Sequence, residues 1–167
     1  ADVLDALGRA QQASGELNQA ISTYSKLSDL QPNSPMPFMR MADLFLASKN
    51  KDSAAQSLKK ALGVKPDLLD AQRGLITLGM DAKKISESVA IAKVVQKQRP
   101  KESIGYIFEG DIAAAQKNWD EAASIYRIGL KEAPGTELAL KLHTVLLAAA
   151  KPAEADKFAG TWLKENA

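Results

Sequence analysis

The chain has 167 residues, of which 46% are hydrophobic and 25% charged, the composition of an ordinary soluble folded protein. Its net charge of +2 gives no reason to expect nucleic acid or an anionic membrane as a partner. Cysteine is absent, which excludes disulfides and thiolate metal sites.

Three residue types recur along the chain with a period of 34. Prolines close each period, at Pro32, Pro66, Pro100 and Pro134. Small residues allow close helix contact at Ala20, Ala54, Ser88 and Ala122. Two positions before each small residue stand favoured helix N-caps: Asn18, Asp52, Ser86 and Asp120. Because proline lacks an N–H and ends helices, this period predicts a repeated pair of helices.

The first repeat, residues 1–34, is predicted to form helices over 2–13 and 18–30, separated at Gly15. The second repeat, residues 35–68, keeps apolar faces on both of its expected helices. The same helix pair is expected in each later repeat.

The third repeat, residues 69–102, is the most degenerate. Gly74 and Gly79 lie inside its first expected helix, where each costs about 1 kcal/mol relative to alanine. We therefore expect this repeat to be the softest part of the chain. The fourth repeat, residues 103–136, recovers the pattern, and in the fifth, residues 137–167, proline suits the start of the second helix.

The first repeat carries the signature residues of one repeat family at Leu7, Gly8, Ala20, Tyr24 and Pro32. On these residues the sequence resembles the tetratricopeptide repeat (TPR) family. The resemblance implies an all-α, right-handed superhelical solenoid of antiparallel helix pairs, with about five TPR units and ten helices. We interpret residues 1–167 as a single array and as a fragment of a longer protein.

No arrangement of residues typical of catalysis is present. His143 is the only histidine, so a two-histidine metal site cannot form, and we interpret it as a half-buried structural residue. No glycine-rich phosphate loop, nucleophile elbow or paired-carboxylate motif occurs. We predict that the protein is not an enzyme and uses no cofactor or metal.

Lysines recur near the turn between paired helices, at Lys51, Lys83, Lys84, Lys117 and Lys151. Cations at a helix C-terminus are stabilised by the helix dipole, which is a sufficient structural explanation. The alternative is a basic edge for an acidic polymer or for lipid headgroups. Without interleaved aromatic residues the lysines make a poor nucleic-acid platform.

By family resemblance, the first helices of the repeats line a concave groove that binds peptides or partner proteins. The residues expected to line it are Asp5, Arg9, Met36, Met39, Arg40, Asp43, Asp70, Arg73, Thr77, Ile104, Ile107, Phe108, Asp111, Leu138, Lys141 and Leu142. One TPR binding mode clamps a C-terminal carboxylate with basic residues. Asp5 and Asp70 stand where such residues would be needed, so that mode is rejected.

The expected lining changes character along the chain. Acids and arginines alternate in the first three repeats, whereas apolar residues dominate in the last two. An amphipathic segment, most simply a helix laid in the groove, would match both ends. The alternative is that the apolar residues pack against a neighbouring helix and face no ligand.

A narrower resemblance covers the last two repeats. Residues 105–112, 138–143, 151–155 and 162–164 are similar to the PEP-CTERM-system TPR-repeat lipoproteins. That resemblance implies a bacterial, periplasm-facing envelope protein associated with exopolysaccharide production or export, or with PEP-CTERM protein sorting. Any membrane attachment would use a segment absent from this fragment.

Together these features predict a protein–protein interaction scaffold that binds a peptide or partner protein in the groove. The alternative from a different class is a structural module that self-associates weakly through uncapped solenoid ends. The sequence does not name the partner.

Overall fold

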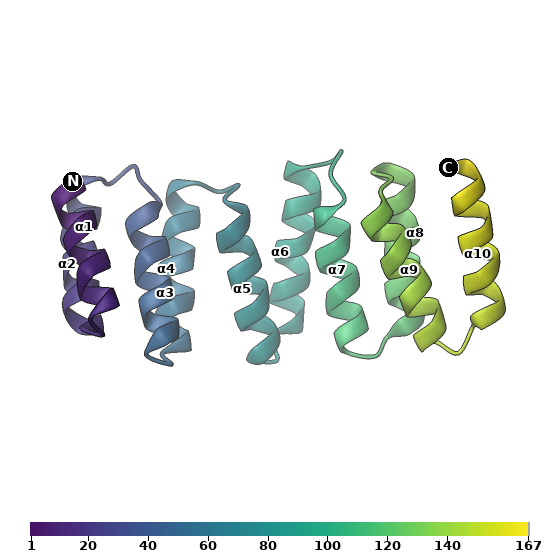
Figure 1. Ribbon diagram of the computed structural model, residues 1–167, viewed down its shortest axis with the longest axis horizontal. Helices are drawn as coiled ribbons and strands as arrows, with labels where there is room; N and C mark the ends of the chain where they lie inside the picture. Colours follow the sequence, from purple (N-terminus) through teal and green to yellow (C-terminus); the bar gives the residue numbers. More distant parts are fainter. Residues whose placement is uncertain (167) are drawn as a thin grey trace. The chain divides into compact units, whose positions relative to one another are not determined.

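The computed structural model describes residues 1–166. Within that range the regular secondary structure consists of α-helices, and no strand is present (Figure 1). They are α1 (Asp2–Ala13), α2 (Leu17–Leu30), α3 (Met36–Ala47), α4 (Lys51–Val64), α5 (Leu69–Asp81), α6 (Ile85–Gln98), α7 (Ile104–Ala115), α8 (Trp119–Glu132), α9 (Thr136–Ala148) and α10 (Pro152–Glu165). The prediction of an all-α chain with ten helices is confirmed. The first helix begins and ends at the predicted residues.

The chain divides into two compact units, which we call the N-terminal unit (Ala1–Leu78) and the C-terminal unit (Gly79–Ala167). Within the N-terminal unit, α1 packs on α2, α2 on α3 and α3 on α4. Within the C-terminal unit, α6 to α10 likewise pack each on the next. Among α1–α4 and among α6–α10, helices that follow one another in sequence are therefore neighbours in space, as a repeat architecture requires.

The predicted N-caps of the second helices are wrong. The residues at the cap positions are Glu16, Asn50, Lys84 and Asn118, two positions before the predicted ones. The cause is the turn, in which one residue adopts a positive φ of 58–77° at Gly15, Lys49, Lys83, Lys117 and Ala150. This single left-handed residue reverses the chain so tightly that the second helix starts almost at once. The predicted caps consequently lie in the first helical turn.

A glycine–tyrosine contact organises the core of each unit. In the N-terminal unit, Tyr24 is fully buried and packs so closely on Gly8 that a Cβ there would lie 2.7 Å from Tyr24 Cζ. In the C-terminal unit, a Cβ at Gly110 would lie only 2.1 Å from Tyr126 Cε1. Both glycines are therefore required by space, and both tyrosines reach across the first helix of their own repeat.

The two glycines of α5 do not leave empty space beside the helix. A Cβ at Gly74 would lie 2.8 Å from Leu58 Cδ1, and one at Gly79 would lie 2.4 Å from Ser88 Oγ. Neighbouring side chains thus fill the room that these glycines provide. The glycines still weaken the helix through backbone entropy.

We expect α5 to exchange its amide hydrogens fastest among the interior helices, in residues 71–81. Two glycines lower its helical stability by about 1 kcal/mol each, and the boundary between the compact units falls within it. Hydrogen exchange read out by mass spectrometry compares this segment with residues 38–46 of α3. Slower exchange in α5 than in α3 would contradict the prediction.

Candidate functional site

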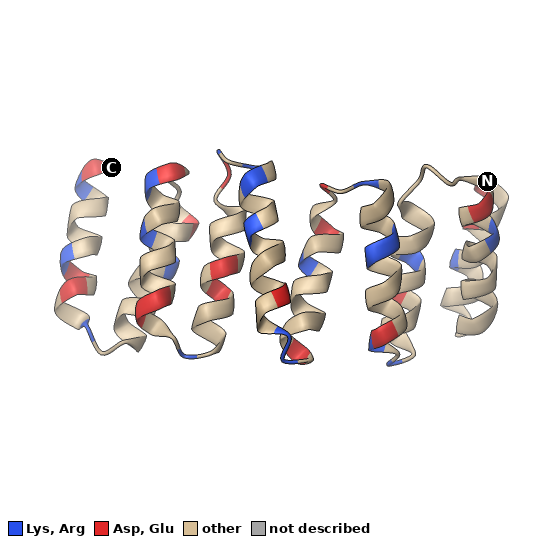
Figure 2. Cartoon of the chain, turned by 180° about the vertical axis from the view of Figure 1, so that it is seen from behind, with Lys and Arg blue, Asp and Glu red and all other residues tan. Residues whose placement is uncertain are grey.

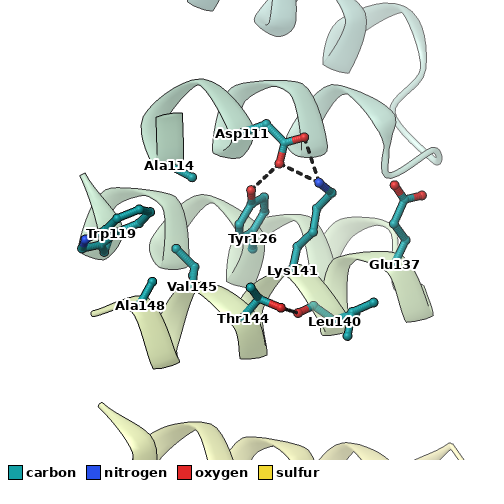
Figure 3. A pocket seen from close by; sticks show the side chains of 10 residues that line it. All are labelled: Asp111, Ala114, Trp119, Tyr126, Glu137, Leu140, Lys141, Thr144, Val145 and Ala148. Carbon is teal, nitrogen blue, oxygen red and sulfur yellow. Dashed lines mark hydrogen bonds and ion pairs between the residues drawn. The ribbon is translucent and has the colours of Figure 1, made fainter. Parts of the chain in front are cut away.

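Three polar side chains of the C-terminal unit, which we call the Asp111 cluster, meet on the face formed by α7 and α9 (Figure 3). The Tyr126 hydroxyl donates to Asp111 Oδ1 at 2.5 Å. Lys141 Nζ donates to both carboxylate oxygens of Asp111, each at 2.8 Å. The sequence predicted Asp111 and Lys141 as groove residues, and the structure brings these two together.

Each member of the Asp111 cluster comes from a different helix. Asp111 lies on α7, Lys141 on α9, and Tyr126 reaches between them from α8 because Gly110 leaves room for its ring. Burial, together with the hydrogen bond to Asp111, raises the pKa of Tyr126 well above its ordinary value. The tyrosine therefore stays a neutral donor, and the Asp111 carboxyl group accepts from it and from Lys141.

A pocket of about 490 Å³ opens beside this cluster. Figure 3 shows its lining: Asp111, Ala114, Trp119, Tyr126, Glu137, Leu140, Lys141, Thr144, Val145 and Ala148. Aliphatic side chains make up much of this lining, and the Asp111 cluster supplies its polar wall. Such a pocket can accept a side chain with an apolar stem and a polar end.

The N-terminal unit has a related group, which we call the Tyr24 cluster: Asp5, Arg9, Tyr24 and Arg40. Arg9 Nε lies 3.2 Å from Asp5 Oδ2, one helical turn along α1. Burial is the main cause that raises the pKa of Tyr24; Asp5 adds to the rise, whereas Arg40 and Arg9 oppose it. Asp5 lies near enough to the buried Tyr24 hydroxyl to act on it as an acceptor, although the two form no hydrogen bond of ordinary geometry, and the buried Arg40 Nε has no hydrogen-bond partner among the described residues.

Six further residues of the predicted groove, both polar and apolar, lie on α3 and α5. Met36 and Asp43 are exposed on α3, and Met39 is half-buried. Asp70, Arg73 and Thr77 are exposed on α5, where the Thr77 hydroxyl donates to the Arg73 carbonyl at 3.1 Å. These side chains are accessible to a ligand.

Four of the apolar residues predicted to line the groove lie in the interior instead. Ile107, Leu138 and Leu142 are 4%, 0% and 1% exposed, and Phe108 is also buried. Ile104 is half-buried. Ile107, Leu138 and Leu142 belong to the core between α7, α8 and α9, so the alternative of packing against a neighbouring helix holds for them. Their burial removes them from the candidate surface.

Comparison with known proteins agrees with this architecture. Residues 6–68 match the family model described as tetratricopeptide repeat. The crystal structure of MamA protein superposes with a TM-score of 0.69 at 16% identity, covering 98% of this chain and 90% of the other. The fold is the tetratricopeptide-repeat fold. A search of curated proteins found no match.

Other TPR structures are similar to this chain. A tetratricopeptide repeat protein from Parabacteroides merdae ATCC 43184 has a TM-score of 0.67 at 16% identity, covering 99% of this chain and 65% of the other. YrrB, described as a TPR protein with an unusual peptide-binding site, has a TM-score of 0.59 at 14% identity, covering 90% and 78%. At these identities the likeness concerns the fold alone.

Sequence reasoning missed the two tyrosines of the TPR second helices, because it looked for ligand contacts only on first helices. A signal was present: Tyr24 follows Gly8, and Tyr126 follows Gly110, by the same sixteen residues. A glycine sixteen residues before a tyrosine leaves room for the tyrosine ring to pack across the first helix of the repeat. Leu140 and Trp119, which also line the pocket, had no such signal.

A second, more apolar pocket of about 240 Å³ lies between α9 and α10 of the TPR fold. It contains the half-buried His143 beside Phe158 and Trp162. Within residues 1–166 no group of acidic and histidine side chains could hold a metal ion. None of the helices described is both long and apolar enough to cross a membrane.

Charged residues of both signs occur along the TPR helices of each unit (Figure 2). One of the lysines at the turns has an acidic neighbour, since Lys151 Nζ lies 2.5 Å from Asp120 Oδ1. Arg127 and Glu154 form another ion pair between α8 and α10.

Proposed function

We propose that the protein is a protein–protein interaction scaffold that binds a peptide or partner protein along the first helices of its repeats. The observation that carries this proposal is the pocket of about 490 Å³ between α7 and α9, with an ion pair in its wall. The TPR fold generally serves as an interaction scaffold, and the peptide-binding site named for YrrB supports the same use of the fold. The bound segment would place an apolar side chain against Leu140 and Val145 and a polar group at the Asp111 cluster.

The contact surface comprises exposed or half-buried residues of the predicted groove. In the C-terminal unit these include Asp111 and Lys141, and in the N-terminal unit Arg9, Arg40 and Asp43. The buried apolar residues of the predicted groove, such as Ile107, Leu138 and Leu142, cannot contact a ligand. The ligand that fits this surface is therefore more polar than the one expected from the sequence. An amphipathic peptide with one or two apolar anchors meets this requirement.

Leu140→Glu is expected to abolish partner capture. Leu140 is 66% exposed at the pocket, so the substitution adds a charge where an apolar anchor would be desolvated, without disturbing the core. The readout is affinity capture from the native host with the full-length protein as bait. The matched control is Ile128→Glu, because Ile128 is 51% exposed on the second helix α8. Equal capture by both variants would contradict the proposal.

The five repeats would act as a single array within a longer protein. The resemblance of residues 105–112 and 138–143 to PEP-CTERM-system lipoproteins would place that protein on the periplasmic side of a bacterial envelope. Its pathway would then be exopolysaccharide production or export, or PEP-CTERM protein sorting.

Self-association is the second candidate, favoured by one observation. The apolar pocket between α9 and α10 adjoins Leu140 and Leu163, which are 66% and 67% exposed. A second copy could cover these side chains. A sedimentation coefficient that rises with protein concentration would favour this candidate, whereas a constant one would exclude it.

A further inference from the structure

One acidic side chain of the pocket between α7 and α9 has no partner. The charged residues of the pocket lining are Asp111, Glu137 and Lys141. Lys141 Nζ donates to both carboxylate oxygens of Asp111, each at 2.8 Å. The carboxylate of Glu137, an exposed residue in the first turn of α9, forms no hydrogen bond or ion pair within residues 1–166. The acids of the lining therefore outnumber its base, and Glu137 is the acid that is left unpaired.

The ordinary partner of Glu137 is engaged elsewhere. Lys141 follows Glu137 by four residues on α9, and this order of glutamate and lysine favours an ion pair along a helix. Figure 3 shows the Lys141 side chain reaching toward Asp111 instead, with Glu137 at the end of the pocket opposite Trp119. The Tyr126 hydroxyl donates to the same Asp111 carboxyl group at 2.5 Å. The described part of the chain therefore supplies no basic side chain to Glu137, and a ligand can supply one.

An apolar surface adjoins Glu137 on the same face of α9. Leu140 follows it by three residues, which is about one helical turn, and is 66% exposed. Val145 and Ala148 extend this apolar wall. Arginine and lysine side chains lie with their methylene stems along apolar surface while the charged end reaches a polar group. A carboxylate next to an exposed leucine therefore complements a basic side chain in both charge and polarity.

We propose that the ligand of this pocket is a peptide segment with a basic residue, arginine or lysine, that pairs with Glu137. An apolar residue of the same segment covers Leu140. On α9 these two contacts lie about 5–6 Å apart, and side chains two positions apart in an extended peptide lie on one side, about 7 Å from each other. The apolar and the basic residue of the ligand are therefore separated by one residue. The inference rests on the proposed peptide-binding function and adds the sign of the ligand's charge and its place in the ligand.

The test is a titration of the full chain with acetyl-Leu-Gly-Arg-amide, followed by NMR at the backbone N–H signal of Leu140. The matched probe is acetyl-Leu-Gly-citrulline-amide, in which an uncharged urea group of almost the same shape replaces the guanidinium. Both peptides should shift the signal. The arginine peptide should bind about threefold more tightly, which is the usual strength of an exposed ion pair. Equal affinities would overturn the inference.

Glu137→Gln should remove this preference. Glutamine keeps the size of the side chain, so the citrulline peptide should bind the variant as tightly as the wild type, and the arginine peptide no more tightly than the citrulline peptide. Glu87→Gln is the matched control. Glu87 is likewise exposed in the first turn of a helix and unpaired among the described residues, but it lies on α6 and does not line this pocket. A preference that survives in Glu137→Gln, or that is lost in Glu87→Gln, would contradict the proposal.

Failure of this inference is distinguishable from failure of the proposed function. If the arginine peptide has no advantage, or does not bind, while Leu140→Glu still loses the partner, only the basic requirement is wrong. If neither peptide shifts the Leu140 signal and partner capture is insensitive to Leu140→Glu as well, the first helices are not the binding surface.

Discussion

Gly110→Ala is expected to destabilise the C-terminal unit by about 1–3 kcal/mol, the usual cost of forcing extra atoms into a packed core. The new Cβ would lie 2.1 Å from Tyr126 Cε1 and 2.6 Å from its Cδ1. Because that ring is 2% exposed and enclosed by the core, it cannot move aside without disturbing its neighbours. The measurement is the free energy of unfolding from urea denaturation.

Gly160→Ala is the matched control for this substitution. Gly160 lies inside α10 with no atom within 4 Å of the position of a new Cβ. There the same change should stabilise the protein by about 0.5–1 kcal/mol, through the higher helix propensity of alanine. If the two variants had equal stability, the close glycine–tyrosine contact would not be what fixes Tyr126.

Tyr126→Phe is expected to cost about 1.5 kcal/mol of unfolding free energy, because Asp111 loses a charged hydrogen bond. Hydrogen bonds to charged groups contribute about 1.5–3 kcal/mol. We expect the low end of this range because the Asp111 side chain is 46% exposed and water can replace part of the bond. The raised pKa of Tyr126 adds a pH dependence. Its proton stabilises the fold fully below the unfolded pKa of 10.0, and this contribution is lost as the pH rises beyond it. The difference between wild type and variant should therefore shrink above about pH 10.

Tyr24→Phe provides the comparison within the same chain. The Tyr24 hydroxyl forms no hydrogen bond of ordinary geometry among the described residues, so its removal should leave stability unchanged or slightly increased. The contrast is measured at neutral pH without ligand. A loss as large as that of Tyr126→Phe would show that the Tyr24 hydroxyl is satisfied within the protein.

The fold could be predicted from the sequence because its signals are local and repeated. Helix α1 spans the residues that the 34-residue period predicted, and Pro152 begins α10 as expected. The N-cap positions could not be predicted in this way. They depend on one left-handed residue in each turn, and Lys49 or Lys117 gives no sign of a positive φ in the sequence.

The candidate site was predictable only in part. The repeat positions correctly placed Asp111 and Lys141 on neighbouring first helices, which is why their pairing follows naturally. They did not show that Leu138 and Leu142 are covered, because burial depends on how closely adjacent helices approach. The hydroxyl of Tyr126 enters the site from a second helix, which a rule restricted to first helices cannot detect.

The central claim is that the first helices carry the binding surface. Site-specific photocrosslinking tests it most directly, with benzoylphenylalanine placed at Leu140 or at Ile128 in the full-length protein in its native host. Both positions are exposed, at 66% and 51%, and lie on a first and a second helix of adjacent repeats. We predict a covalent adduct with the partner from position 140 and none from position 128. An adduct formed only from position 128 would contradict the claim.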